Sequence, residues 1–283
     1  TGYVALKANT TGCFNAGHGF GALRFTTTGK WNTATGSYSL YQNTTGNTNT
    51  ASGYNSLKNN TTGCCNTAFG GHALQSNTTG ASNTASGFNA LKANTTGAWN
   101  TAHGFKSQAS NTSAHYNTSS GAYSLLGNST GTCNTAHGYA TLTSNTTGVN
   151  NVAIGTRSLN GNTTASYNTA VGGCALYANT TGTENTAVGF CALKTNTTGS
   201  YNTASGYAAL QSNTTGGSNT ASGWHALNSN TTAMSNVAYG RTSMYYNTTG
   251  TQNAAIGNHS LYSNSTGSQN TASGYKALFA NTT

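Results

Sequence analysis

Small and hydrophobic residues recur along this chain with a period of 17 residues. When each repeat is counted from its first Asn, position 3 is almost always Ala, position 5 is Gly, position 8 is Ala or Ser except at Thr141, and position 9 is Leu except at Gln108 and Met244. Positions 12 to 15 read Asn-Thr-Thr-Gly with small variations, whereas positions 4, 6, 7, 10, 11, 16 and 17 vary freely. A fixed period of this length predicts a repeat architecture in which each repeat forms one structural unit.

The pattern favours short strands over helices. A helix needs hydrophobic residues at intervals of three and four, and so high a density of Gly, Thr and Asn disfavours one. We predict one strand near positions 2 to 5, a second near positions 7 to 11, and a turn at Asn-Thr-Thr-Gly whose Gly can adopt a positive φ. Together these predict an all-β fold, a parallel β-solenoid or β-roll with one coil per repeat and with residues i and i+17 stacked.

The whole chain is expected to be a single repeat array. Residues 1–14 form a partial repeat, residues 15–269 hold fifteen complete repeats, and residues 270–283 form a second partial repeat. Because both ends fall within a repeat, we expect the chain to be a piece of a longer protein.

Two features of the repeat predict a homo-oligomer. Positions 8 and 9 are neighbours in the second predicted strand, so their side chains should face opposite ways, one into the coil and one against another surface. The core is also thin, because one buried Leu stabilises by about 2–3 kcal/mol, whereas ordering each residue costs about 1.5 kcal/mol. We therefore expect self-association, with a trimer as the favoured assembly.

Two repeat positions are expected to have structural roles. The Asn at position 1 predicts a ladder of side-chain amides inside the solenoid, as in stacked cross-β structures. The Gly at position 5 predicts a backbone geometry that every repeat shares. These glycines are Gly2, Gly19, Gly36, Gly53, Gly70, Gly87, Gly104, Gly121, Gly138, Gly155, Gly172, Gly189, Gly206, Gly223, Gly240, Gly257 and Gly274.

Charge is scarce and almost entirely positive. Charged residues make up 4% of the chain, Glu184 is the only acid, and the formal net charge is +9. Five of the ten basic residues share position 10, namely Lys7, Arg24, Lys58, Lys92 and Lys194. We interpret them as solubilising charge; a basic track for nucleic acid or an anionic glycan is the alternative. Since, of these five residues, only Arg24 is followed by an aromatic residue, we expect no nucleic-acid partner.

The supply of catalytic and metal-binding groups is poor. A single acid leaves no carboxylate pair for acid–base chemistry and no Asp for a Ser-His-Asp triad. The seven His and six Cys show no convergent metal-ligand spacing. Cys174 and Cys191 share position 7 in successive repeats, and we expect free, packed thiols. The chain is predicted not to be an enzyme, to use no metal or cofactor, and to have no membrane span, since no long apolar run is present.

Position 12 begins an N-x-Ser/Thr triplet in all but one repeat. Such triplets are glycan acceptors in a glycosylating pathway, although turns rich in Asn and Thr also create them by composition alone. The candidate acceptors are Asn9, Asn43, Asn60, Asn77, Asn94, Asn111, Asn128, Asn145, Asn162, Asn179, Asn196, Asn213, Asn230, Asn247, Asn264 and Asn281.

Aromatic residues recur at position 6. They can cover the thin core or a chain interface, or they can bind the faces of sugar rings. Interruptions at Gly71, Gly173, Arg241 and Asn258 favour packing over a continuous binding track.

Several repeats resemble a known family. The segments NVAIGTRS at 151–158, NTAVG at 168–172 and NAAIGNHS at 253–260 resemble the N-S-V-A-I-G-x-x-S units in the heads of trimeric autotransporter adhesins and similar repeats of phage tail fibres. The resemblance implies a left-handed parallel β-roll, three chains around one axis, and an adhesive surface module. It covers positions 1 to 8 of each repeat. The 17-residue length, the often polar position 4 and the fixed Asn-Thr-Thr-Gly depart from the family.

These features predict a structural role outside the cell. The leading expectation is an extracellular, cell-surface or virion-borne fibre or filament shaft with no catalysis. The alternative is an adhesin or tail-fibre module that binds surface glycans. Ice binding ranks last, because a flat array of Thr wants T-x-T on one strand face, whereas here two adjacent Thr at positions 13 and 14 should point two ways.

Overall fold

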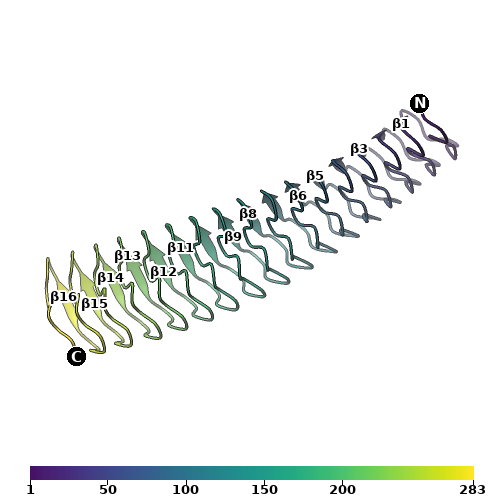
Figure 1. Cartoon of the computed structure of the whole chain (residues 1–283). Coiled ribbons are helices and arrows are strands. Elements are labelled where there is room, and N and C mark those ends of the chain that lie inside the picture. Colours follow the sequence, from purple (N-terminus) through teal and green to yellow (C-terminus); the bar gives the residue numbers. More distant parts are fainter. The chain divides into compact units, whose positions relative to one another are not determined.

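The structure is a computed structural model that describes residues 1–283. It contains no helix and sixteen strands of three residues each, all at positions 2 to 4 of the repeat (Figure 1). The chain comprises two compact units, a first of Thr1–Ala140 with Asn145–Thr147 and a second of Thr141–Ser144 with Gly148–Thr283.

The strand bounds follow the repeat in both units. The first unit holds β1 (Ala16–His18), β2 (Thr33–Thr35), β3 (Thr50–Ser52), β4 (Thr67–Phe69), β5 (Thr84–Ser86), β6 (Thr101–His103), β7 (Thr118–Ser120) and β8 (Thr135–His137). The second holds β9 (Val152–Ile154), β10 (Thr169–Val171), β11 (Thr186–Val188), β12 (Thr203–Ser205), β13 (Thr220–Ser222), β14 (Val237–Tyr239), β15 (Ala254–Ile256) and β16 (Thr271–Ser273).

Within each unit, every strand pairs in parallel with the strand of the next coil. The register places each residue opposite its counterpart 17 residues away, as in Ala51 opposite Ala68 between β3 and β4. The predicted all-β parallel solenoid, with one coil per repeat and i to i+17 stacking, is therefore confirmed.

The second predicted strand is wrong. Positions 7 to 11 form a succession of turns, in which positions 7 and 9 adopt left-handed backbone angles, as in His72 (φ 60°) and Leu74 (φ 51°). Their N–H groups still bond to neighbouring coils, but in opposite directions. His72 donates to the Tyr54 carbonyl at 2.8 Å, and Leu74 donates to the Ala90 carbonyl at 3.0 Å. Positions 7 and 9 therefore form hydrogen bonds to neighbouring coils, as strand residues would, although they do not belong to a strand.

This backbone places positions 8 and 9 on the same side. Ala73 and Leu74 are both fully buried, although they are neighbours in sequence. A Cβ at Gly17, a position-3 residue, would lie 3.6 Å from Leu6 Cγ and 3.7 Å from Ala22 Cβ, so positions 3, 8 and 9 meet inside the coil. The prediction that positions 8 and 9 face opposite ways is wrong, because it assumed a strand, and it no longer supports a homo-oligomer.

Position 5 requires Gly for two physical reasons. From Gly19 to Gly274 these residues have φ between +117° and +139°, a range that residues with a side chain rarely adopt. Neighbouring coils also approach closely there, since a Cβ on Gly53 would lie 2.6 Å from the Gly70 carbonyl oxygen.

Position 15 requires a small residue for a different reason. Its glycines are not among the residues with positive φ, so the predicted turn conformation is wrong. A Cβ on Gly46 would instead lie 2.4 Å both from Asn43 Oδ1 and from the Gly63 carbonyl oxygen. Close packing of the Asn side chain and the next coil, not backbone conformation, selects a small residue here, which is Gly in most repeats and Ala at Ala114, Ala165 and Ala233.

Candidate functional surface

Two ladders of Asn side chains run inside the coils. At position 1, Asn66 donates from its backbone N–H and its Nδ2 to Asn49 Oδ1 at 3.0 and 3.1 Å, and from Nδ2 to the Gly80 carbonyl at 2.8 Å. At position 12, Asn77 Nδ2 donates to Asn60 Oδ1 at 2.7 Å and to the same Gly80 carbonyl at 2.9 Å. Each ladder links successive coils, and the position-15 carbonyl joins the two ladders within one coil.

The position-12 ladder contains the candidate glycan acceptors. Fourteen of the sixteen have no exposed surface; Asn9 is exposed and Asn281 is half-buried. A sugar on Nδ2 would replace one donated hydrogen and would need a path to solvent that the folded coil lacks. Burial therefore argues against glycans on the fourteen inner residues, and the intact mass of protein from a glycosylating host is the direct test.

The two Thr of each repeat have different partners. The Thr61 carbonyl accepts hydrogen bonds from the N–H groups of Thr44, Thr45 and Gly46 at 2.9, 3.2 and 3.3 Å, and from Thr44 Oγ1 at 3.0 Å. Position 13 thus uses its hydroxyl in the stack. Position 14 is exposed in every repeat. Positions 12 to 15 form a turn and not a strand, so the two Thr do not follow the alternation of side chains that a strand would impose.

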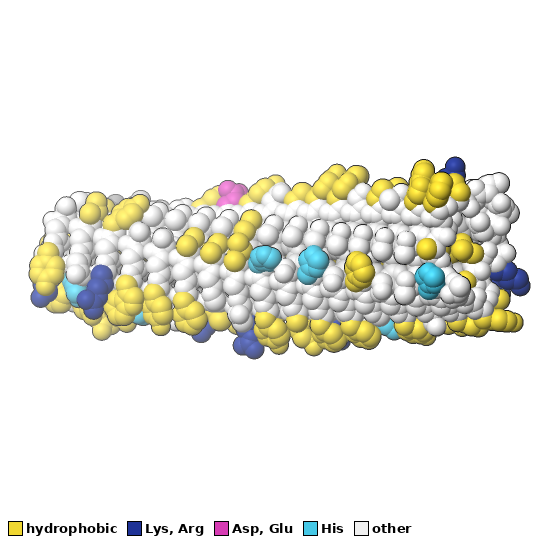
Figure 2. Space-filling view, turned by 90° about the horizontal axis from the view of Figure 1, so that it is seen from above, with side chains coloured by type: hydrophobic (Ala, Val, Ile, Leu, Met, Phe, Trp, Pro, Cys, Tyr) yellow, Lys and Arg dark blue, Asp and Glu magenta, His cyan; other side chains and the backbone are white.

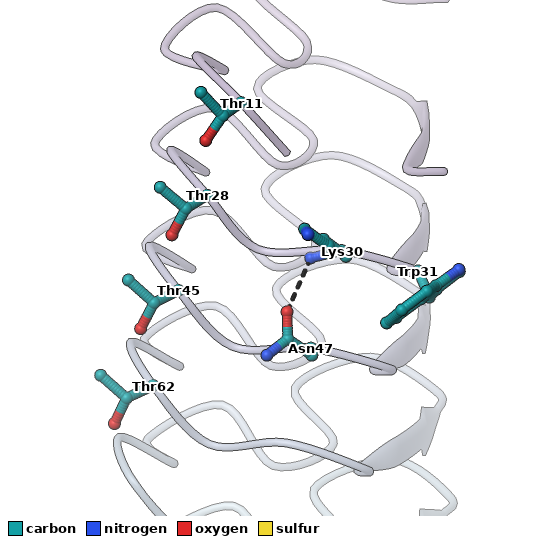
Figure 3. Close-up of a pocket in the computed structure, with 7 residues that line it drawn as sticks. All are labelled: Thr11, Thr28, Lys30, Trp31, Thr45, Asn47 and Thr62. Atoms are coloured by element: carbon teal, nitrogen blue, oxygen red, sulfur yellow. Dashed lines mark hydrogen bonds between the residues drawn. The ribbon is translucent and has the colours of Figure 1, made fainter. Parts of the chain in front are cut away.

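A shallow groove lies beside the position-14 column in the first unit. It is lined by Thr11, Thr28, Lys30, Trp31, Thr45, Asn47 and Thr62. Figure 3 shows the four Thr side chains oriented alike, and the Lys30 N–H donates to Asn47 Oδ1 at 2.8 Å. The Trp31 indole stacks on Phe14 with 6.1 Å between ring centroids. The lining offers hydroxyls, one ammonium and one indole, but no pair of groups suited to proton transfer.

The titratable side chains form no metal-binding cluster. No three His, Cys, Asp or Glu residues come together as a metal site, and all six Cys are free thiols. Burial raises the pKa of the Cys191 thiol, which lies beside Cys174, and that of Cys65, which lies beside Cys64. A raised thiol pKa lowers the thiolate fraction, so neither has the character of an activated nucleophile.

Aromatic rings form a continuous row in the first unit, and we call it the aromatic row. Each of nine successive coils contributes one ring from position 6 or 7, and adjacent ring centroids lie 5.3–6.4 Å apart. The rings are those of Tyr3, Phe20, Tyr38, Tyr54, His72, Phe88, Phe105, Tyr123 and Tyr139. Where position 6 has no ring, at Ser37, Gly71 and Ala122, position 7 supplies one.

This continuity corrects the sequence-based argument at Gly71. The His72 ring lies 5.3 Å from Tyr54 and 5.6 Å from Phe88, so the row passes Gly71 without a gap. The six position-6 rings of the row are 40–77% exposed, so a large part of each ring is in contact with solvent and not with the protein. The second unit does contain gaps, since the coils with Gly173 and Cys174 and with Arg241 and Thr242 have no ring at either position.

Basic side chains lie on the same surface. Five of the six Lys and Arg residues of the first unit stand at position 7 or 10, next to the row, and only Lys30 stands elsewhere. Lys58 Nζ lies 5.6 Å from the Tyr38 ring centroid, and Lys106 Nζ lies 5.3 Å from that of Phe105, which is the range of cation–π contacts. Figure 2 shows hydrophobic side chains gathered in rows, with basic side chains beside the lower one.

No protein-family model, curated protein or solved structure matches the chain. No helix with the length and apolar character of a membrane span is present. A function can therefore be inferred only from the fold and from the chemistry of the surface residues.

Proposed function

We propose that this repeat array is a structural module, a shaft or spacer of an extracellular or virion-borne fibre. The observation that carries the proposal is that, within each unit, successive coils stack through the same pattern of backbone bonds and through the Asn ladders, of which the position-12 ladder is interrupted only at Thr26, independently of the variable surface residues. In such an array each coil contacts only its neighbours, so length can change by whole coils without altering the fold.

The distribution of chemistry supports the same role. The residues that recur in every repeat are buried or bond to neighbouring coils, apart from the exposed hydroxyls at position 14. The variable positions bring together no group of three or more His, Cys, Asp or Glu residues. Self-association and an extracellular location belong to the proposal through the resemblance to adhesin and tail-fibre repeats.

Removal of whole repeats tests this function. Deletion of residues 49–65, one complete repeat, joins two coils in register and should leave cooperative unfolding with a small decrease in stability. Deletion of residues 49–57 removes about half a coil and should divide the array into two segments that unfold separately and at lower temperature, because it breaks both ladders at that coil. Equal damage from the two deletions, measured by circular dichroism and thermal unfolding, would refute a modular shaft.

A further inference from the structure

We propose that the aromatic row binds an anionic polysaccharide that carries about one carboxylate or sulfate for every two sugar rings. The inference goes beyond the shaft function, because it concerns residues that stacking of the coils does not require. It rests on the coincidence of exposed rings, basic side chains and the absence of acids on one surface of the first unit.

The electrostatics of this surface select an anionic partner. The first unit has no Asp or Glu, and five of its six basic residues, Lys7, Arg24, Lys58, Lys92 and Lys106, stand at positions 7 and 10 beside the row. No carboxylate in the first unit competes for these cations; Lys7 and Lys92 are exposed, whereas Arg24 Nη1 donates to the Tyr41 hydroxyl at 2.9 Å. Attraction of this kind is screened by salt.

The rings select a partner with apolar faces. The exposed fractions of Tyr54 and Phe88 are 53% and 48%, and both rings meet neighbours on adjacent coils. Aromatic side chains present a large, rigid apolar surface at low entropic cost, which suits the C–H faces of sugar rings. The row repeats with the coil, about every 4.8 Å, so a linear polymer along the stack meets one ring after another.

The ratio of rings to cations distinguishes a polysaccharide from single-stranded nucleic acid. The nine coils of the row carry nine rings and five cations at positions 7 and 10. A nucleic acid brings one phosphate for each base, and its bases bind by stacking on ring faces. A polysaccharide in which charged and neutral sugars alternate matches the observed ratio.

The repeats themselves supply substitutions that the fold tolerates. Gln75 stands at the position of Lys58 and Lys92, and Ser37 stands at the position of Tyr54 and Phe88. The test variants are therefore Lys58→Gln with Lys92→Gln, and Tyr54→Ser with Phe88→Ser. The matched controls lie off the row: Lys30→Asn, since Asn47 occupies that position, and Trp31→Ser, since Ser82 does.

Binding is measured on the full 283-residue chain with three probes: hyaluronan oligosaccharides, in which a carboxylate alternates with a neutral sugar, neutral dextran, and a 20-nucleotide oligothymidylate. We expect hyaluronan to bind, to weaken as salt rises, and to exceed the other two. Each double variant on the row should lose about tenfold in affinity, and each control should stay within about twofold. Thermal unfolding confirms that each variant is folded.

Three results would overturn the proposal. The first is no binding of hyaluronan at low salt, and the second is tighter binding of oligothymidylate, which would assign the row to nucleic acid. The third is an equal loss for Lys30→Asn and for the double Lys variant, which would reduce the effect to net charge. The whole-repeat deletion that tests the shaft is read out by folding alone, so the two proposals can fail separately.

Discussion

Gln108 Nε2 donates a hydrogen bond of 2.8 Å to Ser119 Oγ in the next coil. Gln108 replaces the Leu found at fifteen of the seventeen position-9 sites, and Ser119 is the only Ser at position 3. Nε2 also donates to the Thr101 carbonyl at 2.9 Å, whereas Oε1 is buried without a partner. Two of the exceptions to the core pattern are thus partners of each other.

The pair predicts a coupled effect on stability. Ser119→Ala alone should destabilise, because it removes one acceptor from a buried amide, at a cost of about 1–3 kcal/mol. Gln108→Leu together with Ser119→Ala should be more stable than the natural chain, because it restores the Leu and Ala of other coils and removes the unpaired Oε1. Denaturant unfolding of both single variants and the double variant measures the coupling; additive effects would contradict it.

The left-handed residues predict a stabilising Gly substitution. Thr48 at position 17 is exposed and has a φ of 56°, a conformation that is costly for a β-branched residue. Thr48→Gly should raise stability by about 1 kcal/mol. The control is Thr45→Gly, at an exposed residue without positive φ, which should destabilise through backbone entropy. Changes of the same sign in both variants would show that backbone strain at Thr48 is not the cause.

The position-12 ladder predicts a large cost for removing one rung. Asn77→Ala deletes both donated bonds of Asn77 and the acceptor of Asn94 Nδ2, at 2.8 Å, inside a fully buried column. We expect a loss of roughly 2–4 kcal/mol. Asn59→Ala, one position before the ladder residue Asn60 and half-buried, should change stability by less than about 0.5 kcal/mol. Comparable losses in the two variants would mean that the ladder does not stabilise the stack.

His225 predicts a pH dependence in the second unit. Burial among rings, including Trp224 with its centroid 4.0 Å away, lowers the pKa of His225. The unfolded chain therefore binds a proton before the folded chain does, and stability falls as pH drops below the ordinary His range near 6.5. His225→Asn, the residue at the same position in other coils, should make the loss between pH 7 and 5 smaller. An unchanged profile would exclude His225 as the cause.

Periodicity identified the solenoid, the register and the buried Ala and Leu, because each repeat must present the same face to its neighbours. It failed at positions 7 to 11, where left-handed residues such as Leu74 are non-Gly and carry no local sequence signal. It also placed Asn77 in a turn and offered it as a glycan acceptor, although a ladder bond to Asn60 holds its side chain inside the coil. The continuity of the aromatic row at Gly71 was not predicted, because only position 6 was considered there, whereas the ring belongs to His72 at position 7.

Pulsed electron-spin distances within the first unit test the central claim, that one coil forms per 17 residues. With the native Cys replaced by residues found at the same positions elsewhere, labelled cysteines replace Thr28 and either Thr96 or Thr130, which lie four and six repeats apart at exposed position 14. Stacked coils predict narrow distributions near 19 and 29 Å, about 4.8 Å per coil. Broad distributions near 45 and 55 Å, roughly those of a flexible chain of 68 and 102 residues, would contradict it.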